Sequence, residues 1–180
     1  MFKKFTKDDV HTQTNVKSSV QRALRTKLVN QYPKLEESIK ILMPKKSTVV
    51  LYKCEDKINL YAVNDEVLFY QKFDELFPSL KLIHMYPSCF PRVQVDRGAI
   101  KFILSGANIM CPGLTSKGAK LPDEDIAKGT TVAVYAEGKE NALAVGKLLM
   151  STDEIKKVNK GMGIELIHYL ADGLWNFEIE

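Results

Sequence analysis

Residues 96–114 of the 180-residue chain read DRGAIKFILSGANIMCPGL. The apolar spacing from Arg97 to about Leu104 predicts a short helix that ends at Gly106. A turn and a short strand at Asn108–Cys111 follow. Glycine at positions 106 and 113 permits positive φ and close backbone approach, so exposed N–H groups can meet a phosphate or a sugar. The pattern suits contact with nucleic acid, although similar glycine turns occur in purely structural loops.

The rest of the second half consists of short β-type runs separated by glycines and other turn residues. A helix interrupts them after Ser151, which is placed to cap it, with Glu154 at the capping-box position and an end near Asn159. The predicted strands are Arg92–Asp96, Asn108–Cys111, Thr130–Ala136, Ala142–Met150, Glu165–Leu170 and Leu174–Ile179. Strands of this length and spacing are typical of a small barrel or sandwich.

The first half has a different pattern, in which helices precede a group of strands. Apolar residues at helical spacing predict an amphipathic helix over Val16–Gln31, with Asn15 as its cap and Pro33 beyond its end. The other predicted elements are helices at Leu35–Met43 and Pro78–Tyr86, and strands at Thr48–Cys54, Ile58–Val63 and Val67–Gln71. Short polar breaks between these strands favour an antiparallel meander packed on the helices. The chain is therefore predicted to be α+β, with an N-terminal α/β domain over residues 1–91 and a C-terminal β domain over residues 92–180.

Composition places the chain among folded proteins, with 45% apolar and 27% charged residues. No apolar run reaches the roughly 18–20 residues of a membrane span, and the N-terminus lacks the apolar region of a signal peptide. A cytoplasmic protein without membrane contact is therefore expected. The net charge of +4 is uneven: residues 1–90 hold 15 Lys and Arg against 10 Asp and Glu, and residues 91–180 hold 11 against 12. General attraction to phosphate is thus expected mainly from the first half.

No constellation of catalytic or metal-binding residues emerges from the sequence. The three cysteines are odd in number and far apart, at Cys54, Cys89 and Cys111, which favours buried small side chains over a disulfide or a zinc site. The histidines are equally scattered, at His11, His84 and His168, and neither a P-loop nor an H-E-x-x-H helix accompanies them. The acidic run at positions 123–125 is typical of a solvated loop. No catalytic residue, metal or cofactor is therefore predicted.

The stretch 96–114 also carries a family resemblance. Together with Ala144-Val145-Gly146 and Gly161-Met162-Gly163-Ile164, it resembles a PUA domain, and the match covers about Arg92 to Asp172. The resemblance implies a small β pseudo-barrel. In that fold the first helix, the turn and strand that follow it, and part of the last strand form the RNA-binding surface.

A narrower resemblance extends over nearly the whole chain and is carried by several motifs. The chain resembles the malignant T-cell-amplified sequence protein family at Val95–Ser116, Val158–Gly161, Ile167–Trp175, Ile41–Lys46, Val63–Asn64 and Leu82–Pro87. This resemblance implies a non-catalytic translation factor that pairs with density-regulated protein and binds the small (40S) ribosomal subunit. It further implies action in reinitiation and in the release of deacylated tRNA, with the PUA domain holding the tRNA acceptor end.

The resemblance also implies an RNA surface, formed by Arg97, Lys101, Ser105, Gly106, Ala107, Asn108, Met110, Pro112 and Gly113, with Lys139 and Lys147 as weaker additions. Arg97 and Lys101 are one helical turn apart and are expected to contact phosphate from the same helix face. Ile109 and Met110 alternate along a strand, so one of them is expected to serve packing only. The helix is apolar almost all round, and Phe102 is therefore a candidate contact to the partner protein, with an ordinary core position as the alternative.

In the first half, charge and resemblance together suggest a ribosome-facing set, formed by Arg22, Arg25, Lys45 and Lys46. Two other functions stay open. PUA domains are also attached to RNA-modifying enzymes, so the alternatives are an RNA-binding subunit of such an enzyme and a protein-interaction adaptor whose PUA surface no longer binds RNA. Because the second half is nearly neutral, its RNA recognition is expected to depend on close contacts from Gly106 to Gly113, while the first half supplies general attraction.

Overall fold

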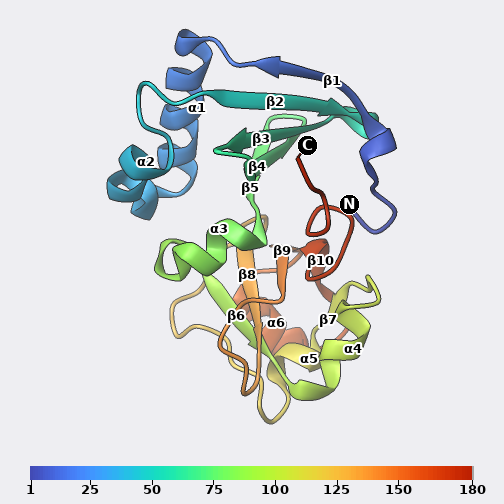
Figure 1. Ribbon diagram of the computed structural model, residues 1–180. Coiled ribbons are helices and arrows are strands. Elements are labelled where there is room, and N and C mark those ends of the chain that lie inside the picture. The colour runs from blue at the N-terminus through green and yellow to red at the C-terminus, as the bar shows by residue number, and fades with distance from the viewer. Residues whose placement is uncertain (180) are drawn as a thin grey trace. The chain divides into compact units, whose positions relative to one another are not determined.

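The computed structural model describes residues 1–179, and the chain folds into two compact units. Among the described residues, the N-terminal unit comprises Thr6–Phe90 and residues 177–179, and the C-terminal unit comprises Pro91–Asn176 and Met1–Phe5. Each unit contains one five-stranded sheet, and Figure 1 labels their elements. Each unit therefore includes a short segment from the opposite end of the chain: Met1–Phe5 belongs to the C-terminal unit, and residues 177–179 belong to the N-terminal unit.

The sheet of the N-terminal unit is an antiparallel meander in which neighbouring strands are also neighbours in sequence. Its strands are β1 (Val10–Asn15), β2 (Val49–Cys54), β3 (Ile58–Val63), β4 (Glu66–Lys72) and β5 (Glu75–Pro78). Asn64 and Asp65, with φ of 52° and 62°, form the turn between β3 and β4. Two successive positive φ values give the turn a twist that fits a hairpin, and Asn and Asp tolerate this conformation better than most residues.

Three helical elements fill the connection between β1 and β2, namely α1 (Ser18–Gln31), η2 (Pro33–Leu35) and α2 (Glu36–Leu42), where η denotes a 3-10 helix. The other helical elements of the unit lie before β1, between β2 and β3, or after β5, and they are η1 (Lys7–Asp9), η3 (Glu55–Lys57), α3 (Leu80–Met85) and η4 (Pro87–Cys89). One face of α1 is buried through Leu24 and Leu28. The Tyr32 hydroxyl, just after α1, donates to the Leu76 carbonyl of β5 at 2.8 Å. A buried hydrogen bond therefore joins the helix to the sheet.

The N-terminal unit differs from the sequence prediction in two strands and one cap. β1 and β5 are absent from the prediction, because β1 is a polar strand at the sheet edge without a buried side chain and β5 has only four residues. Asn15 is predicted to cap α1, but it pairs with Val50 inside β1, and the actual cap position is Lys17, which makes no side-chain cap bond. The other predicted helices and strands are confirmed, with ends within two residues.

The sheet of the C-terminal unit curls into a half-barrel and joins strands that lie far apart in sequence. Its order is β6 (Arg92–Val95), β8 (Thr131–Ala136), β9 (Ala144–Leu148), β10 (Met162–Tyr169) and β7 (Ile109–Met110). β6 and β8 are parallel, and the other neighbours are antiparallel. At Gly146 of β9, a Cβ atom would overlap the Cγ2 atom of Ile164 on β10. The glycine therefore permits the close packing of these two strands.

Short helical elements connect these strands: η5 (Arg97–Ala99), α4 (Ile100–Ile103), α5 (Pro112–Thr115) and α6 (Thr152–Val158). Asp96 begins the first of them, since its Oδ1 accepts the Ala99 N–H at 3.0 Å. Ser151 caps α6 as predicted, and its hydroxyl accepts the Glu154 N–H at 3.1 Å. Helices and strands enclose one apolar core, which includes Val95, Ile103, Ile109, Leu114, Val134, Ile155 and Ile164.

The end of the chain is not the strand that the sequence predicts over Leu174–Ile179. Asp172 holds a turn there instead, because its Oδ1 accepts the Trp175 N–H and its Oδ2 accepts the Tyr169 N–H, both at 2.9 Å. Pro112 and Gly113, which follow the predicted strand Asn108–Cys111, begin α5. The end of the chain differs from the prediction because the Asp172 side chain turns the chain where the residue types alone favour a strand.

The remaining predicted elements of the second half are present, although β7 and β9 are shorter than expected and β10 begins three residues earlier. The α+β fold class is confirmed, with an antiparallel sheet and helices followed by a curled sheet. Among residues 1–179, no helix combines the length and the apolar character needed to cross a bilayer.

Candidate nucleic-acid interface

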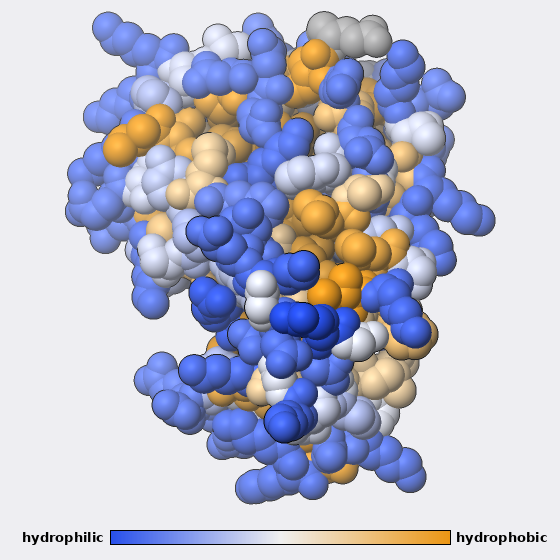
Figure 2. Space-filling model, turned by 60° about the horizontal axis from the view of Figure 1, so that its bottom comes forward, coloured by the Kyte–Doolittle hydropathy of each residue, from blue (hydrophilic) through white to orange (hydrophobic). Residues whose placement is uncertain are grey.

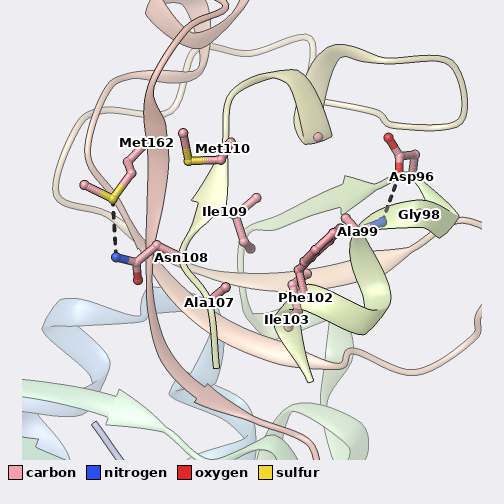
Figure 3. Close-up of a pocket in the computed structure, with 11 residues that line it drawn as sticks. Asp96, Gly98, Ala99, Phe102, Ile103, Ala107, Asn108, Ile109, Met110 and Met162 are labelled. Carbon is pink, nitrogen blue, oxygen red and sulfur yellow. Dashed lines mark hydrogen bonds between the residues drawn. The ribbon is translucent and has the colours of Figure 1, made fainter. Parts of the chain in front are cut away.

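A pocket of about 690 Å³ opens on the C-terminal unit. Its lining consists of Asp96, Gly98, Ala99, Phe102, Ile103, Ala107, Asn108, Ile109, Met110, Gly113 and Met162. Figure 3 shows the pocket between helix α4, which carries Phe102 and Ile103, and the strands that carry Met110 and Met162. The segment from residue 96 to residue 113 therefore supplies the whole lining except Met162, which comes from β10.

Most of the lining is apolar, and its largest side chains are accessible to solvent. Phe102, Met110 and Met162 are 57%, 49% and 51% exposed, whereas Ile103 and Ile109 are buried. Large apolar side chains that stay exposed around a concave surface are a common feature of binding sites. Figure 2 shows hydrophobic side chains gathered near the centre of a largely hydrophilic face. The pocket is therefore suited to a flat apolar surface such as the face of a nucleobase.

Asn108 brings a polar group to the pocket, and its orientation is fixed by β10. Its Oδ1 accepts the Leu166 N–H at 2.9 Å. Its Nδ2 donates to the Met162 sulfur at 3.4 Å, as the dashed line in Figure 3 marks. An amide nitrogen carries two N–H groups, so the second one stays available to a ligand.

Asp96 places a carboxylate in the lining, on the other side of the pocket from Asn108 (Figure 3). Its Oδ1 caps η5, and its Oδ2 accepts a hydrogen bond from the Ser116 hydroxyl. The carboxylate therefore has a structural role at the start of the helix. A negative group at this position also repels phosphate, so the phosphates of a bound nucleic acid are best placed away from it.

The predicted pair of phosphate contacts, Arg97 and Lys101, has two different neighbours. The Lys101 ammonium lies 5.1 Å from the centre of the Phe102 ring and is therefore close to the pocket. The Arg97 guanidinium lies against Gly138, in the turn between β8 and β9 that also carries Lys139. The structure thus separates two positive positions, one beside the pocket and one at this turn.

The structure brings four of the predicted RNA-binding residues into the pocket lining, namely Ala107, Asn108, Met110 and Gly113. It leaves the others outside the lining, namely Arg97, Lys101, Ser105, Gly106, Pro112, Lys139 and Lys147. Ser105 completes the helix end, since its hydroxyl donates to the Phe102 carbonyl at 2.7 Å. Lys147 lies on β9, opposite Glu165 and Thr131. Within the strand pair, Ile109 is the packing residue and Met110 is the exposed one.

Met162 is the main lining residue that the sequence prediction omits. It pairs with Met110 across β10 and β7, although the two are far apart in sequence. Its only sequence signal is a large apolar residue between two glycines, Gly161 and Gly163. That signal becomes informative once the strand register places the two methionines side by side.

The four candidate ribosome-facing residues have unequal surroundings. Arg22, Lys45 and Lys46 are exposed. Arg25 is half-buried, and its Nη1 is shielded from solvent without a hydrogen-bond partner among the described residues. Arg25 is therefore a poorer candidate for contact with another molecule than the other three.

The three cysteines and His168 are buried, whereas His11 lies on the surface. All three cysteines are free and buried, as predicted, and burial, with a smaller effect of the Asp9 charge, raises the pKa of Cys54 to about 12. His168 is buried and hydrogen-bonded to Asp172 at 2.7 Å, whereas His11 lies 3.2 Å from the Glu55 carboxylate on the surface. Within the described part of the chain, no three such side chains are grouped as a metal site would require.

The charge of the folded units differs from the charge of the sequence halves. The C-terminal unit holds 13 Lys and Arg against 10 Asp and Glu, which gives +3, because Lys3 and Lys4 belong to it. The stretch Thr6–Phe90 also holds 13 against 10. Because Glu178 also belongs to the N-terminal unit, that unit is less positive than the C-terminal unit, and the pocket lies in a moderately basic unit rather than in a neutral one.

Known protein families and known proteins match this chain over nearly its whole length. A family model described as a Pre-PUA-like domain matches residues 4–87, and one described as a PUA domain matches residues 91–170. The chain is 66% identical to "Translation machinery-associated protein 20" of Saccharomyces cerevisiae, with 100% of both chains covered. It is 50% identical to "Malignant T-cell-amplified sequence 2" of Homo sapiens, covering 99% of this chain and 98% of the relative. A solved hypothetical protein from Pyrococcus horikoshii matches with a TM-score of 0.72 at 26% identity, covering 91% of this chain and 98% of that one.

Proposed function

Because the chain belongs to the family of translation machinery-associated protein 20 and the malignant T-cell-amplified sequence proteins, we propose that it is a non-catalytic translation factor that binds RNA through its PUA domain. It binds the small ribosomal subunit together with density-regulated protein. There it promotes reinitiation and the release of deacylated tRNA after termination. The pocket of the PUA domain contacts the acceptor end of the tRNA.

The observation that carries this proposal is the exposed apolar lining of the pocket. A nucleobase in a duplex hides both faces in the stack, whereas the unpaired 3′ end of a tRNA presents them. Phe102, Met110 and Met162 offer a surface against which one such base can stack. The remaining N–H of the Asn108 side chain can donate to the edge of that base or to its sugar.

The cations outside the lining are assigned to the phosphates. Lys101 is close enough to the pocket to reach a phosphate next to the stacked base. Arg97 and Lys139, at the turn between β8 and β9, and Lys147 on β9 are placed for more distant phosphates. The Asp96 carboxylate repels phosphate from its own side of the pocket, so the phosphate next to the stacked base is expected on the side of Lys101.

Phe102 has two candidate roles, contact with RNA and contact with density-regulated protein. Its place in the pocket lining supports the first. A Phe102→Asp variant separates the roles, because it keeps the surface accessible but cannot stack. We expect this variant to lose tRNA affinity and to bind density-regulated protein as the wild type does. Loss of the partner together with retained tRNA binding would assign the residue to the protein interface instead.

Replacing Phe102 by alanine tests the pocket directly. The loss of stacking should weaken the binding of deacylated tRNA about 5- to 150-fold, which corresponds to roughly 1–3 kcal/mol. Phe73→Ala is a matched control, since Phe73 is 70% exposed, lies in the other unit and also has a lysine near its ring. The affinities can be measured by fluorescence anisotropy across a salt series.

The outcomes of this experiment decide between the candidate functions. A selective effect of Phe102→Ala supports the proposal. No salt-dependent tRNA binding by the wild-type protein would favour the protein-interaction adaptor. Formation of pseudouridine or transfer of a methyl group to RNA by the purified chain would instead support the alternative function in RNA modification.

A further inference from the structure

The first five residues form a fixed part of the PUA-domain unit. Phe2 is fully buried and Phe5 is 9% exposed. Their rings meet edge to face at 5.4 Å, and the Phe2 ring also lies 5.9 Å from the His168 ring. Burial of two aromatic side chains in five residues anchors a segment that would otherwise fray at a chain end.

Backbone contacts lock this segment against the turn after β10. The Gly173 N–H donates to the Phe2 carbonyl at 3.0 Å. A Cβ atom at Gly173 would overlap the Phe5 carbonyl, so only glycine permits the close approach. The same turn is held by the buried Asp172. The two residues between the phenylalanines, Lys3 and Lys4, are therefore presented from a rigid support.

Lys3 extends from this support across Gly106. A Cβ atom at Gly106 would lie 2.9 Å from the Cδ atom and 3.2 Å from the Cε atom of Lys3. Gly106 has φ of +91°, a value that residues with a Cβ rarely adopt. The absence of a side chain at Gly106 thus leaves space in which the aliphatic part of the Lys3 side chain packs, and the Lys3 ammonium is bonded to the last carbon of that part, Cε.

The position of this ammonium matters because Gly106 directly precedes two residues of the pocket lining, Ala107 and Asn108. Lys3 is exposed, and none of the carboxylates between residues 1 and 179 forms an ion pair with it. A lysine whose stem is packed loses less side-chain entropy when its ammonium meets an anion. Its charge therefore stays available beside the pocket.

We propose that Lys3 contacts a phosphate of the RNA whose base occupies the pocket, so that the binding surface includes the N-terminal segment of the chain. This inference rests on the proposed function. It extends the surface beyond the second half of the sequence, to a residue about one hundred positions from the rest of the pocket. Lys3 and Lys101 then supply the charge close to the pocket, and Lys4, the neighbouring exposed lysine, serves as the control.

The test compares Lys3→Ala with Lys4→Ala in the full chain, with deacylated tRNA as the probe. Removal of one phosphate contact to a single strand should lower the slope of log affinity against log salt by about 0.7. The loss of affinity in Lys3→Ala should therefore shrink about 2.6-fold when salt rises from 50 to 200 mM. Lys4→Ala should keep the wild-type slope, and Lys3→Arg should restore it.

Failure of this inference is distinguishable from failure of the proposed function. If wild-type protein binds tRNA and Lys3→Ala shows the wild-type slope and affinity, the role of Lys3 is overturned while the pocket assignment stands. Equal losses in Lys3→Ala and Lys4→Ala would also overturn it, because they would reflect general charge alone. If Phe102→Ala binds as the wild type does, the pocket assignment itself fails. Equal unfolding temperatures of all variants exclude an effect on the fold.

Discussion

The two units solve the same problem of turning the chain in different ways. All ten glycines lie in the C-terminal unit, and the stretch Thr6–Phe90 has none. Its tight turns use residues with side chains at positive φ, among them Asp56, Asn64, Asp65 and Phe73. In the C-terminal unit, some glycines stand where another group comes close, as Lys3 does at Gly106 and Ile164 at Gly146, whereas an added Cβ at Gly129 or Gly161 would meet no atom within 4 Å. Close approach at Gly106 and Gly146 therefore depends on glycine, and the pocket lies in the same unit.

The two sheets also differ in how the order of their strands follows the sequence. The N-terminal sheet joins strands in sequence order, whereas the C-terminal sheet pairs β6 with β8 and β7 with β10. A surface built from the second sheet therefore combines residues from distant segments, as Met110 and Met162 illustrate. The N-terminal unit instead presents its candidate residues as separate exposed charges, such as Arg22, Lys45 and Lys46.

The largest effect is expected from Asp172→Ala. Asp172 is 2% exposed and accepts hydrogen bonds from His168, Tyr169 and Trp175. Removing one partner of a buried network of this kind costs about 3–5 kcal/mol of unfolding free energy. Urea unfolding, with hydrogen exchange to locate the change, should show the loss in the C-terminal unit. Asp125→Ala, at an exposed carboxylate that accepts the Asp153 N–H, should cost clearly less.

Gly146→Ala should cost about 1–3 kcal/mol of unfolding free energy, because the added methyl group overlaps the Ile164 side chain. Gly113→Ala is the control, since a Cβ there would meet the nearest atom, Ala99 Cβ, at an ordinary 3.8 Å. Thermal unfolding of both variants measures the difference. Equal stability of the two would contradict the claim that Gly146 permits the close packing of β9 against β10.

Reversal of Lys45 and Lys46 to glutamate should weaken association with the small ribosomal subunit about tenfold or more, without unfolding the protein. Loss of two phosphate contacts should lower the salt slope of binding by about 1.8. Lys34→Glu with Lys40→Glu makes the same change in charge at two other exposed positions of this unit. Sedimentation with purified subunits compares the two variants, and similar effects would show that only the overall charge matters.

The smallest effect is expected from Phe73→Gly. Phe73 has φ of +55° at the turn between β4 and β5 and is 70% exposed, so its side chain contributes little packing. Glycine relieves the unfavourable backbone conformation, and the unfolding free energy should rise by about 0.5–1 kcal/mol. Asn64→Gly should change it less, because Asn tolerates positive φ. A destabilised Phe73→Gly protein would show that the ring makes a stabilising contact, such as the one with Lys57.

Local patterns allowed much of the fold to be predicted, and long-range contacts explain what was not. The turn at Asn64-Asp65 and the helix cap at Ser151 can be predicted from the sequence, because a few adjacent residues determine each of them. β1 is polar along its length, and only its pairing with β2 makes it a strand. Part of the pocket was predicted from residues 96–114, since one continuous segment lines most of it. Met162 was not predicted, because only the register of β7 and β10 brings it to the pocket, and the position of Lys3 beside Gly106 depends on a buried N-terminal segment.

The most direct test of the proposed pocket compares two forms of one deacylated tRNA. One form is intact, and the other lacks its last three nucleotides. Their affinities for the wild-type protein can be compared at several salt concentrations. If the pocket holds the acceptor end, the shortened tRNA should bind at least about tenfold more weakly at every salt concentration, and Phe102→Ala should remove most of the difference. Equal affinity for the intact and the shortened tRNA would contradict the assignment.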